Sequence, residues 1–259
     1  MIKVRINYET CPLCRSVDYE ESLVGDCSKH PLYKAEIPTL MQWMDCNDCH
    51  HQFVSGYFTD DALKLVFSET HEHQKVGYKI EENRYVSARM IEKVIQYRDS
   101  GTWLDVGFGN GSLLFTAQEY GFEAVGVDLR KANVEALRQE SIEAYCDLVE
   151  KINFKNKLSV VSMMDVLEHI PYPKEVLKDL CSKMVNGGCA LISMPNTENI
   201  CWRLLTKQNV NPYLGEIEHY HNFSRTRLFS LLEECGLKPV RYGVSERYRT
   251  CMEVIAIKK

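Results

Sequence analysis

The sequence predicts an α/β protein: a doubly wound, seven-stranded sheet with helices on both faces, preceded by a small cysteine-rich module. Two observations support this fold class. From residue 101 onward, short apolar runs alternate with segments of helical periodicity. Residues 1–58 show no such alternation and contain two closely spaced pairs of cysteines. A helical connection over residues 59–100 is expected to join this module to a main domain of residues 101–259.

Composition narrows the class of protein. The chain has 259 residues, of which 45% are hydrophobic and 26% charged, which suits one larger domain and a small appendage. A formal net charge of -5 makes a nucleic-acid partner unlikely, because phosphate binding favours clustered lysine and arginine. The start, "MIKVRINYET", lacks the apolar region of a secretory signal, and no apolar run approaches the roughly 20 residues that span a bilayer. We therefore expect a cytoplasmic protein with no membrane partner.

The N-terminal cysteines have the spacing of metal ligands. "CPLC" begins with Cys11 and ends with Cys14, and "CNDC" begins with Cys46 and ends with Cys49. Each pair can hold one ion with two thiolates, and two pairs complete a tetrahedral shell. The segment looks too short and polar to hold a core unaided, so a structural Zn²⁺ would supply stability. The alternative is two unrelated thiol pairs or a redox pair.

The connecting region contains two segments of helical spacing. "DDALKLVF" at 60–67 is the first, and "NRYVSARMIEKVIQYRD" at 83–99 is the second. The second segment places four residues along one face: Val86, Met90, Val94 and Tyr97. The polar stretch between the two segments, residues 68–78, is expected to be a loop.

The main domain follows the order expected of a doubly wound sheet. The predicted strands are 102–107, 122–128, 142–146, 157–164, 189–195, 237–244 and 250–259. The predicted helices are 112–121, 131–140, 173–188 and 224–236. In such a sheet a ligand binds beyond the carboxyl ends of the strands.

A glycine-rich turn follows the first of these strands. In "LDVGFGNG", Gly107, Gly109 and Gly111 allow a tight turn and close approach of a ligand to the backbone. A dinucleotide fingerprint, G-x-G-x-x-G, would need glycine where Ser112 stands. Asp105 before the turn would repel a pyrophosphate but suits a ligand that carries an ammonium group.

Two further acidic residues end neighbouring strands. Asp128, in "VGVD", can accept hydrogen bonds from both hydroxyls of a ribose. Asp147, in "YCDL", could accept one from an adenine amino group.

Together these motifs resemble the class I S-adenosylmethionine-dependent methyltransferases over most of residues 80–259. The resemblance implies a Rossmann-like fold and S-adenosyl-L-methionine as cofactor. It also implies a cofactor-binding set: Asp105, Gly107, Gly109, Gly111, Asp128, Leu129, Asp147, Leu148 and Asp165. A nicotinamide-binding Rossmann domain is the alternative, but it shares only the acidic ribose residue.

The segment after the fourth strand bears on the acceptor. "MMDVLEHIPYP" has neither the Pro-Pro-aromatic motif of adenine-N6 enzymes nor the Pro-Cys nucleophile of cytosine-C5 enzymes. "DVLEHI", "SMPN" and "EHYHNFS" resemble ubiquinone-biosynthesis O-methyltransferases and deoxysugar methyltransferases, and the zinc module resembles that of sugar C-methyltransferases. This implies a small-molecule acceptor, with a sugar or nucleotide sugar of a bacterial polysaccharide or secondary-metabolite pathway favoured. An RNA methyltransferase and a non-catalytic cofactor-binding protein stay open.

Removal of a proton from the acceptor requires a base, and histidine suits that role near neutral pH. The resemblance makes His219 the first candidate, with Glu218 as its orienting partner or a substrate ligand. His169 is the second candidate. Both histidines have structural alternatives: His169 as a helix cap or a partner of a backbone carbonyl, and His219 as a loop residue. The sequence leaves open whether oxygen, nitrogen or carbon is methylated, and the oligomeric state.

Overall fold

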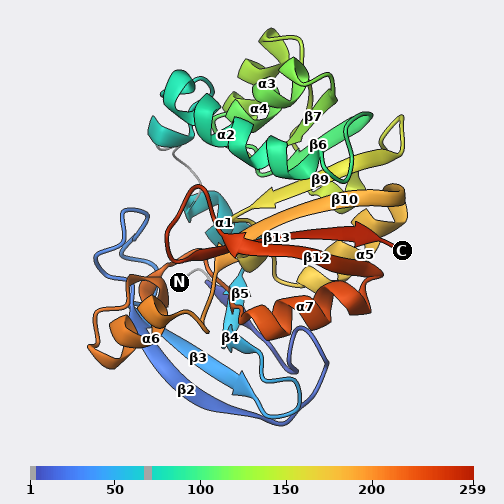
Figure 1. The fold of residues 1–259 in the computed structure, drawn as a ribbon. Helices are drawn as coiled ribbons and strands as arrows, with labels where there is room; N and C mark the ends of the chain where they lie inside the picture. Colours follow the sequence, from blue (N-terminus) through green and yellow to red (C-terminus); the bar gives the residue numbers. More distant parts are fainter. Residues whose placement is uncertain (1–3, 67–71) are drawn as a thin grey trace. The chain divides into compact units, whose positions relative to one another are not determined.

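The computed structural model describes residues 4–66 and 72–259, which fall into two compact units (Figure 1). The first unit contains residues 4–66, 168–174 and 195–231, and the second contains most of the remainder. Part of the loop expected at 68–78 lies outside the described residues. The division into 1–58, 59–100 and 101–259 stays a prediction from sequence. In the described part of the chain, no helix combines the length and the hydrophobicity that crossing a bilayer would take.

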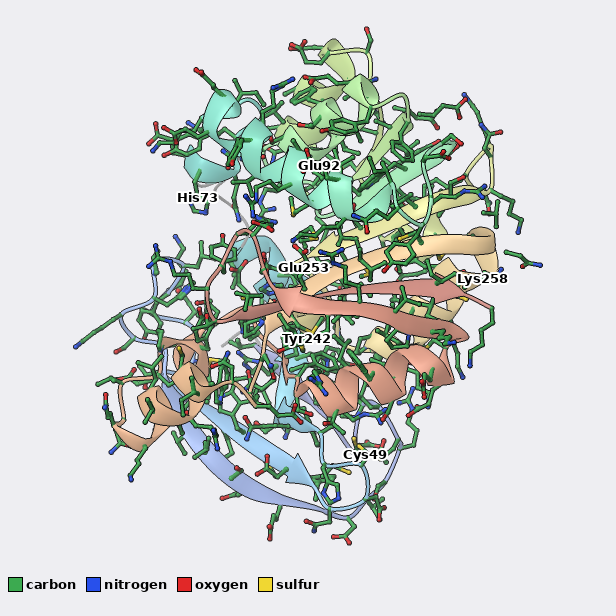
Figure 2. All side chains as sticks on the ribbon, viewed as in Figure 1. Cys49, His73, Glu92, Tyr242, Glu253 and Lys258 are labelled. Carbon is green, nitrogen blue, oxygen red and sulfur yellow. The ribbon has the colours of Figure 1, made fainter. Side chains whose placement is uncertain are left out.

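The second unit is built on a seven-stranded sheet, as the sequence predicts. Its order is β12-β13-β10-β9-β6-β7-β8. The strands β7 and β8 lie on one side of β6, and β9 and β10 lie on the other, so the strand order reverses at β6. Its strands are β6 (Thr102–Val106), β7 (Glu123–Val127), β8 (Glu143–Tyr145), β9 (Leu158–Met164), β10 (Met184–Pro195), β12 (Leu237–Val244) and β13 (Cys251–Lys258). Neighbouring strands along the run β10-β9-β6-β7-β8 pair in parallel, whereas β12 and β13 form an antiparallel pair. Figure 2 labels Tyr242 of β12 with Glu253 and Lys258 of β13.

Helices pack on this sheet through apolar residues, which recur at helical spacing and so form one face of each helix. They are α2 (Ile80–Val94), α3 (Ser112–Glu119), α4 (Lys131–Gln139) and α5 (Pro173–Lys183), and α7 (Arg225–Glu234) ends in this unit. Met90, Ile91 and Val94 of α2 are buried in one core with Trp103 of β6. The helix ends at Val94, so Tyr97 lies beyond it and is 38% exposed. The prediction that Tyr97 lies on the apolar face of this helix is therefore wrong.

A second boundary differs from the sequence prediction. The helix expected over 173–188 ends at Lys183, and β10 begins at Met184. Its pairing with β9 is irregular between Met184 and Cys189, which spans Gly187 and Gly188. The two glycines therefore interrupt the strand pairing and do not end the helix.

The first unit has its own sheets and core. A four-stranded antiparallel sheet has the order β11-β4-β3-β2, and β1 pairs with β5. The strands are β1 (Arg5–Asn7), β2 (Tyr19–Asp26), β3 (Leu40–Cys46), β4 (Gln52–Val54), β5 (Gly56–Phe58) and β11 (His221–Asn222). The helices are α1 (Asp60–Val66) and α6 (Ile200–Lys207), with a short 3-10 turn, η4 (Pro212–Gly215). The sequence predicted neither the strands nor α6.

Residues far along the chain complete the core of this unit. Trp43 of β3 is fully buried, and Ile217 and Tyr220 belong to the same apolar cluster. Apolar side chains from residues 214–220 therefore complete the core that the N-terminal segment begins.

The turn η4 lies directly on β2 at a glycine. The indole Nε1 of Trp43 donates a 2.9 Å hydrogen bond to the Leu214 carbonyl. A Cβ added at Gly25 would stand only 1.7 Å from that carbonyl oxygen. Gly25 is therefore required by close backbone packing and not by a special φ angle.

We expect Gly25→Ala to force η4 away from β2 and to lose about 1–3 kcal/mol, the usual cost of overpacking. In a chain of this size that corresponds to a drop in Tm of roughly 2–12 °C. Gly243→Ala is the matched control, because nothing lies within 4 Å of a Cβ added in that strand. Thermal unfolding followed by circular dichroism distinguishes the two variants, and equal Tm values would contradict the close packing at Gly25.

Candidate functional site

The turn after β6 has the backbone geometry that its glycines permit. Gly107, Gly109 and Gly111 all have positive φ angles, of 68°, 54° and 76°. At Gly107 a Cβ would stand 2.7 Å from the Val166 side chain, so packing also excludes a larger residue. At Gly109 the nearest atom to such a Cβ is 3.9 Å away, which leaves open space over the turn. A ligand could approach the backbone there.

Asp128 lies directly beside this turn. Its carboxylate accepts a 3.3 Å hydrogen bond from the Gly109 N–H and a 2.8 Å hydrogen bond from the Arg130 N–H. The residue is only 3% exposed, and it follows β7, which pairs with β6. Asp128 therefore ties the glycine turn to the neighbouring strand, in the position where the sequence predicts a ribose ligand.

Asp105 is buried inside β6. Ser162 donates a 2.7 Å hydrogen bond to its carboxylate and accepts one of 2.8 Å from the Trp103 indole. Burial raises the pKa of Asp105 to about 7, although the Ser162 hydroxyl and the Arg247 guanidinium oppose the shift. The carboxyl is thus poised to gain negative charge when a cation lies close to it.

Asp165 follows β9 with a left-handed backbone, at φ 59°. Its carboxylate accepts a 2.9 Å hydrogen bond from Ser193 and lies 3.6 Å from the Arg247 guanidinium. Arg247 also donates to the Met164 carbonyl at 3.2 Å. The sequence did not single out Arg247, because its approach to Asp165 depends on the return of the chain before β13.

The residues expected on the adenine side lie at the surface. Asp147 accepts a hydrogen bond from the Leu148 N–H and stands 3.7 Å from Lys151. Leu129 and Leu148 are 55% and 42% exposed. Two exposed leucines that follow adjacent strands are suited to packing against a flat ring.

The four N-terminal cysteines form one cluster. Their sulfurs all lie within 4.8 Å of one another, with Cys11 3.7 Å from Cys49 and Cys14 3.5 Å from Cys46. A tetrahedral ion with Zn–S bonds of about 2.3 Å would place its sulfurs about 3.8 Å apart, so the spacing fits. The hydrogen bond from Cys49 lowers the pKa of the Cys11 thiol below its usual value.

The two cysteine pairs share one backbone conformation. In each, the residue after the second cysteine has a left-handed φ, 66° at Arg15 and 55° at His50. The N–H of that residue bonds the carbonyl of the first cysteine, at 2.9 Å and 3.0 Å. The N–H of Cys11 and that of Cys46 each bond the carbonyl five residues later. Two turns built in the same way present paired sulfurs to a common point, an arrangement that could hold a metal ion.

The candidate bases meet in the first unit. The rings of His169 and His219 are edge to face with centroids 4.8 Å apart, and the Glu168 carboxylate lies within 4.8 Å of a nitrogen of each. His219 is buried, and its Nδ1 has no hydrogen-bond partner among the described residues. Burial, and secondarily the neighbouring His169, lowers its pKa well below 6.5, so the ring is neutral. Sequence reasoning did not list Glu168 as a site residue, although it directly precedes His169.

His169 is oriented by a backbone carbonyl, as one of its sequence alternatives proposed. Its Nδ1 donates a 3.0 Å hydrogen bond to the Glu218 carbonyl, which leaves Nε2 as an acceptor. The carboxylate of Glu218 instead gathers with His30 and Glu216, which form an ion pair. Glu218 thus orients His169 through its main chain.

A second pair of histidines is structural. The Nε2–H of His221 donates to the Ile170 carbonyl at 2.8 Å, so its Nδ1 must accept the 3.0 Å hydrogen bond from His51 Nε2. Burial lowers the pKa of His221 to about 4 and that of His51 as well. Both rings are therefore neutral, and they connect β4 and β11 to residues 168–171.

Comparison with known proteins identifies the fold and family. Residues 80–242 match a family described as a methyltransferase domain. The ubiquinone biosynthesis O-methyltransferase of Proteus mirabilis is 32% identical over 43% of this chain and 50% of its own. The mitochondrial enzyme of that name from Candida albicans is 28% identical over 56% of this chain and 46% of its own. The chain thus spans about half the length of these curated relatives.

A solved structure supports the same fold. Magnesium protoporphyrin IX methyltransferase from Synechocystis, with bound SAH, superposes with a TM-score of 0.55. The match covers 69% of this chain and 84% of that protein at 17% identity. Identity this low supports the fold alone.

Proposed function

Because this chain belongs to the methyltransferase-domain family, we propose that it transfers a methyl group from S-adenosylmethionine to a small-molecule acceptor. The observation that carries the proposal is a set of groups at the ends of two strands: Asp105 buried inside β6, the left-handed glycine turn after β6 and the Asp128 carboxylate after β7. A nicotinamide dinucleotide would bring its pyrophosphate close to Asp105, whereas S-adenosylmethionine carries an α-ammonium group that a carboxylate attracts.

The chain's own residues would hold the cofactor in a fixed orientation. When bound, S-adenosylmethionine supplies an electrophilic methyl group. Asp128 would accept hydrogen bonds from the ribose hydroxyls, and Asp147 would accept one from the adenine amino group. Leu129 and Leu148 would cover the faces of the ring, and the buried Asp105 would attract the ammonium group. Such positioning supplies much of the rate of a methyl transfer, because the donor is already reactive.

We propose His219 as the general base, with His169 beside it. The buried ring of His219 stays neutral across the physiological pH range and its Nδ1 is not engaged by the protein, so it can take a proton from an acceptor hydroxyl. The Glu168 carboxylate, close to both rings, would stabilise an imidazolium once it forms.

We favour a sugar or nucleotide sugar as the acceptor. The support is the resemblance of the "EHYHNFS" and "DVLEHI" segments to small-molecule methyltransferases and the net charge of -5, which disfavours an RNA substrate. We further propose that the four cysteines hold one structural Zn²⁺, since their spacing fits a tetrahedral shell with no open position.

Asp128→Ala should weaken binding of S-adenosylhomocysteine by about 30-fold, or roughly 2 kcal/mol, because two hydrogen bonds to a charged acceptor are lost. Isothermal titration calorimetry measures the change. Asp99→Ala is the control, because Asp99 is an exposed aspartate that precedes β6, at the end of the strand opposite to the glycine turn. This variant should bind S-adenosylhomocysteine with wild-type affinity. Unchanged affinity in Asp128→Ala would exclude it as the ribose ligand, and tight NADH binding by the wild type would refute the proposed cofactor.

His219→Ala should slow turnover by roughly 10²- to 10⁴-fold with little change in cofactor affinity, the range for loss of a general base. Because burial lowers the pKa of His219 well below 6.5, wild-type kcat at saturating cofactor should stay level between pH 8 and 6.5 and decline only in more acidic buffer, where the ring gains a proton. A radiolabelled methyl-transfer assay with nucleotide sugars, and then catechol-like phenols, supplies the rates. If His169→Ala abolishes turnover and His219→Ala spares it, the two roles are reversed.

The purified protein should contain about one zinc ion per chain, and Cys46→Ser should lose it because one of four ligands is removed. Elemental analysis by plasma mass spectrometry gives the stoichiometry, and the Tm of the variant should fall. Cys201→Ser is the matched control, since Cys201 is an exposed cysteine outside the cluster. Full zinc occupancy in Cys46→Ser would refute the ligand assignment.

A further inference from the structure

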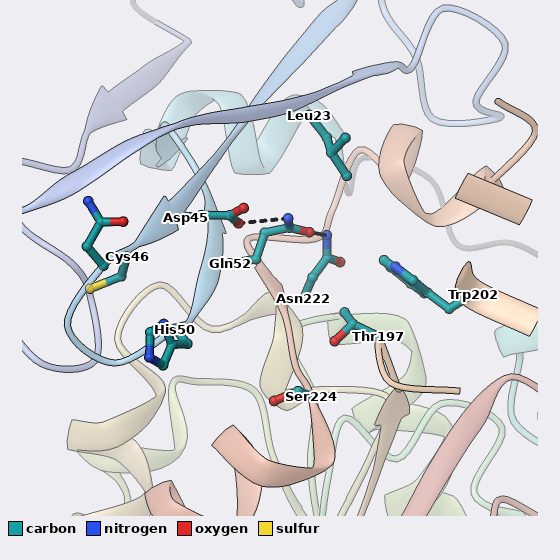
Figure 3. Close-up of a pocket in the computed structure, with 10 residues that line it drawn as sticks. Leu23, Asp45, Cys46, His50, Gln52, Thr197, Trp202, Asn222 and Ser224 are labelled. Atoms are coloured by element: carbon teal, nitrogen blue, oxygen red, sulfur yellow. Dashed lines mark hydrogen bonds between the residues drawn. The ribbon is translucent and has the colours of Figure 1, made fainter. Parts of the chain in front are cut away.

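A polar pocket lies in the first unit, beside the second cysteine pair (Figure 3). Its volume of about 270 Å³ is slightly below the roughly 300 Å³ at which pockets for drug-sized ligands begin, so it suits a single small ring. Residues from four separate stretches line it, mainly with amide, hydroxyl and carboxylate groups. None of the residues proposed above for methyl transfer lines this pocket.

The register of three strands builds one wall of this pocket. Asp45 of β3 stands directly opposite Gln52 of β4, and Gln52 stands opposite Asn222 of β11. Gln52 donates a 2.8 Å hydrogen bond from its amide to Asp45, and Asn222 donates one of 2.8 Å to the Gln52 side-chain oxygen. Figure 3 shows these two bonds as a continuous row from Asp45 to Asn222.

This row fixes which atom of Asn222 lacks a partner. The Asp45 carboxylate can only accept, so the Gln52 NH₂ must point toward it and the Gln52 oxygen must face Asn222. Asn222 therefore uses its NH₂ in the row, and its Oδ1 is left without a hydrogen-bond partner among the described residues. Asn222 is only 2% exposed, and an unpaired acceptor buried so deeply costs about 1–3 kcal/mol. A ligand that donates a hydrogen bond would remove this cost.

The other walls specify the kind of ligand. Thr197 and Ser224 contribute hydroxyl groups, and Trp202 contributes an aromatic wall that stacks on Tyr213 with ring centroids 5.5 Å apart. The described residues that line the pocket include one carboxylate and neither lysine nor arginine. A phosphate or carboxylate ligand would thus meet the Asp45 carboxylate, with the His50 imidazole as the only basic side chain among the described lining residues. A purely apolar ligand would leave the amide row unsatisfied.

We propose that this pocket binds the ring of a neutral, polyhydroxylated ligand, that is, one pyranose-type sugar. Ring hydroxyls donate to Asn222 Oδ1 and the Asp45 carboxylate and exchange hydrogen bonds with Thr197, while the C–H face of the ring packs against Trp202. The site is separate from the residues of methyl transfer. A neutral sugar therefore binds without cofactor, and this inference is independent of the proposed function.

Saturation-transfer NMR on the full-length protein, without cofactor, tests the proposal with the methyl pyranosides of glucose, galactose and mannose. We expect at least one to bind. Thr197→Val, which keeps the shape of the side chain and removes its hydroxyl, should weaken that binding about threefold to tenfold. Asp45→Asn should weaken it about tenfold or more, because the amide row loses its charged acceptor and Gln52 can then reverse.

Thr226→Val is the matched control, since Thr226 is an exposed residue of α7 outside the pocket; it should bind as the wild type does. Inorganic phosphate and glucuronate should not compete with the bound pyranoside. The proposal is overturned if no pyranoside binds, if Thr197→Val and Asp45→Asn both bind like the wild type, or if only the anionic probes bind. In the first case, ordered water alone satisfies Asn222.

Discussion

The register of the hairpin formed by β3 and β4 is the constraint on which the four-stranded sheet of the first unit depends. Cys46 ends β3 and Cys49 lies in the turn, so the geometry that presents two sulfurs to one point is built into the hairpin whose register pairs Asp45 with Gln52. Asp45 and Gln52 consequently stand opposite one another on one face of the hairpin. His51, directly before β4, donates a hydrogen bond to His221. A shift of one residue would reverse the direction of every side chain in β4. The hairpin that carries this cysteine pair thus also carries Asp45 and Gln52 of the polar pocket and His51 of the buried histidine pair.

The second unit depends on a comparable alignment of strand ends. Parallel pairing places Asp105 of β6 opposite Gly126 of β7 and Ser162 of β9. The turns that follow these strands consequently share one edge of the sheet, where Asp128 bonds Gly109 and Asp165 approaches Arg247. A bulkier residue could not replace Gly126, because a Cβ there would stand 2.7 Å from Phe108. Close packing and strand register together keep acidic groups beside an open glycine turn.

Features encoded by neighbouring residues were predictable from sequence. The glycine turn, the strand that precedes it and the spacing of the four cysteines depend on local geometry, and the sheet and the cysteine cluster are confirmed. Features that depend on distant pairing were not predictable: β11 joins the N-terminal sheet, and Ile217 joins its core, through contacts nearly 170 residues along the chain. The ring contact of His169 with His219 arises in the same way. Nothing near Asn222 in the sequence signals that Gln52 will fix its amide.

The place of β11 in the sheet also governs when the first unit can form. His221 bonds His51, which precedes it by 170 residues. At the roughly 5–20 residues per second of protein synthesis, β4 exists for on the order of ten seconds before its neighbour is made. Until then β4 is an edge strand, whose unpaired N–H and C=O groups can pair with another chain. The cysteine-rich segment therefore leaves the ribosome well before β11 but reaches its final pairing only after β11 has been made.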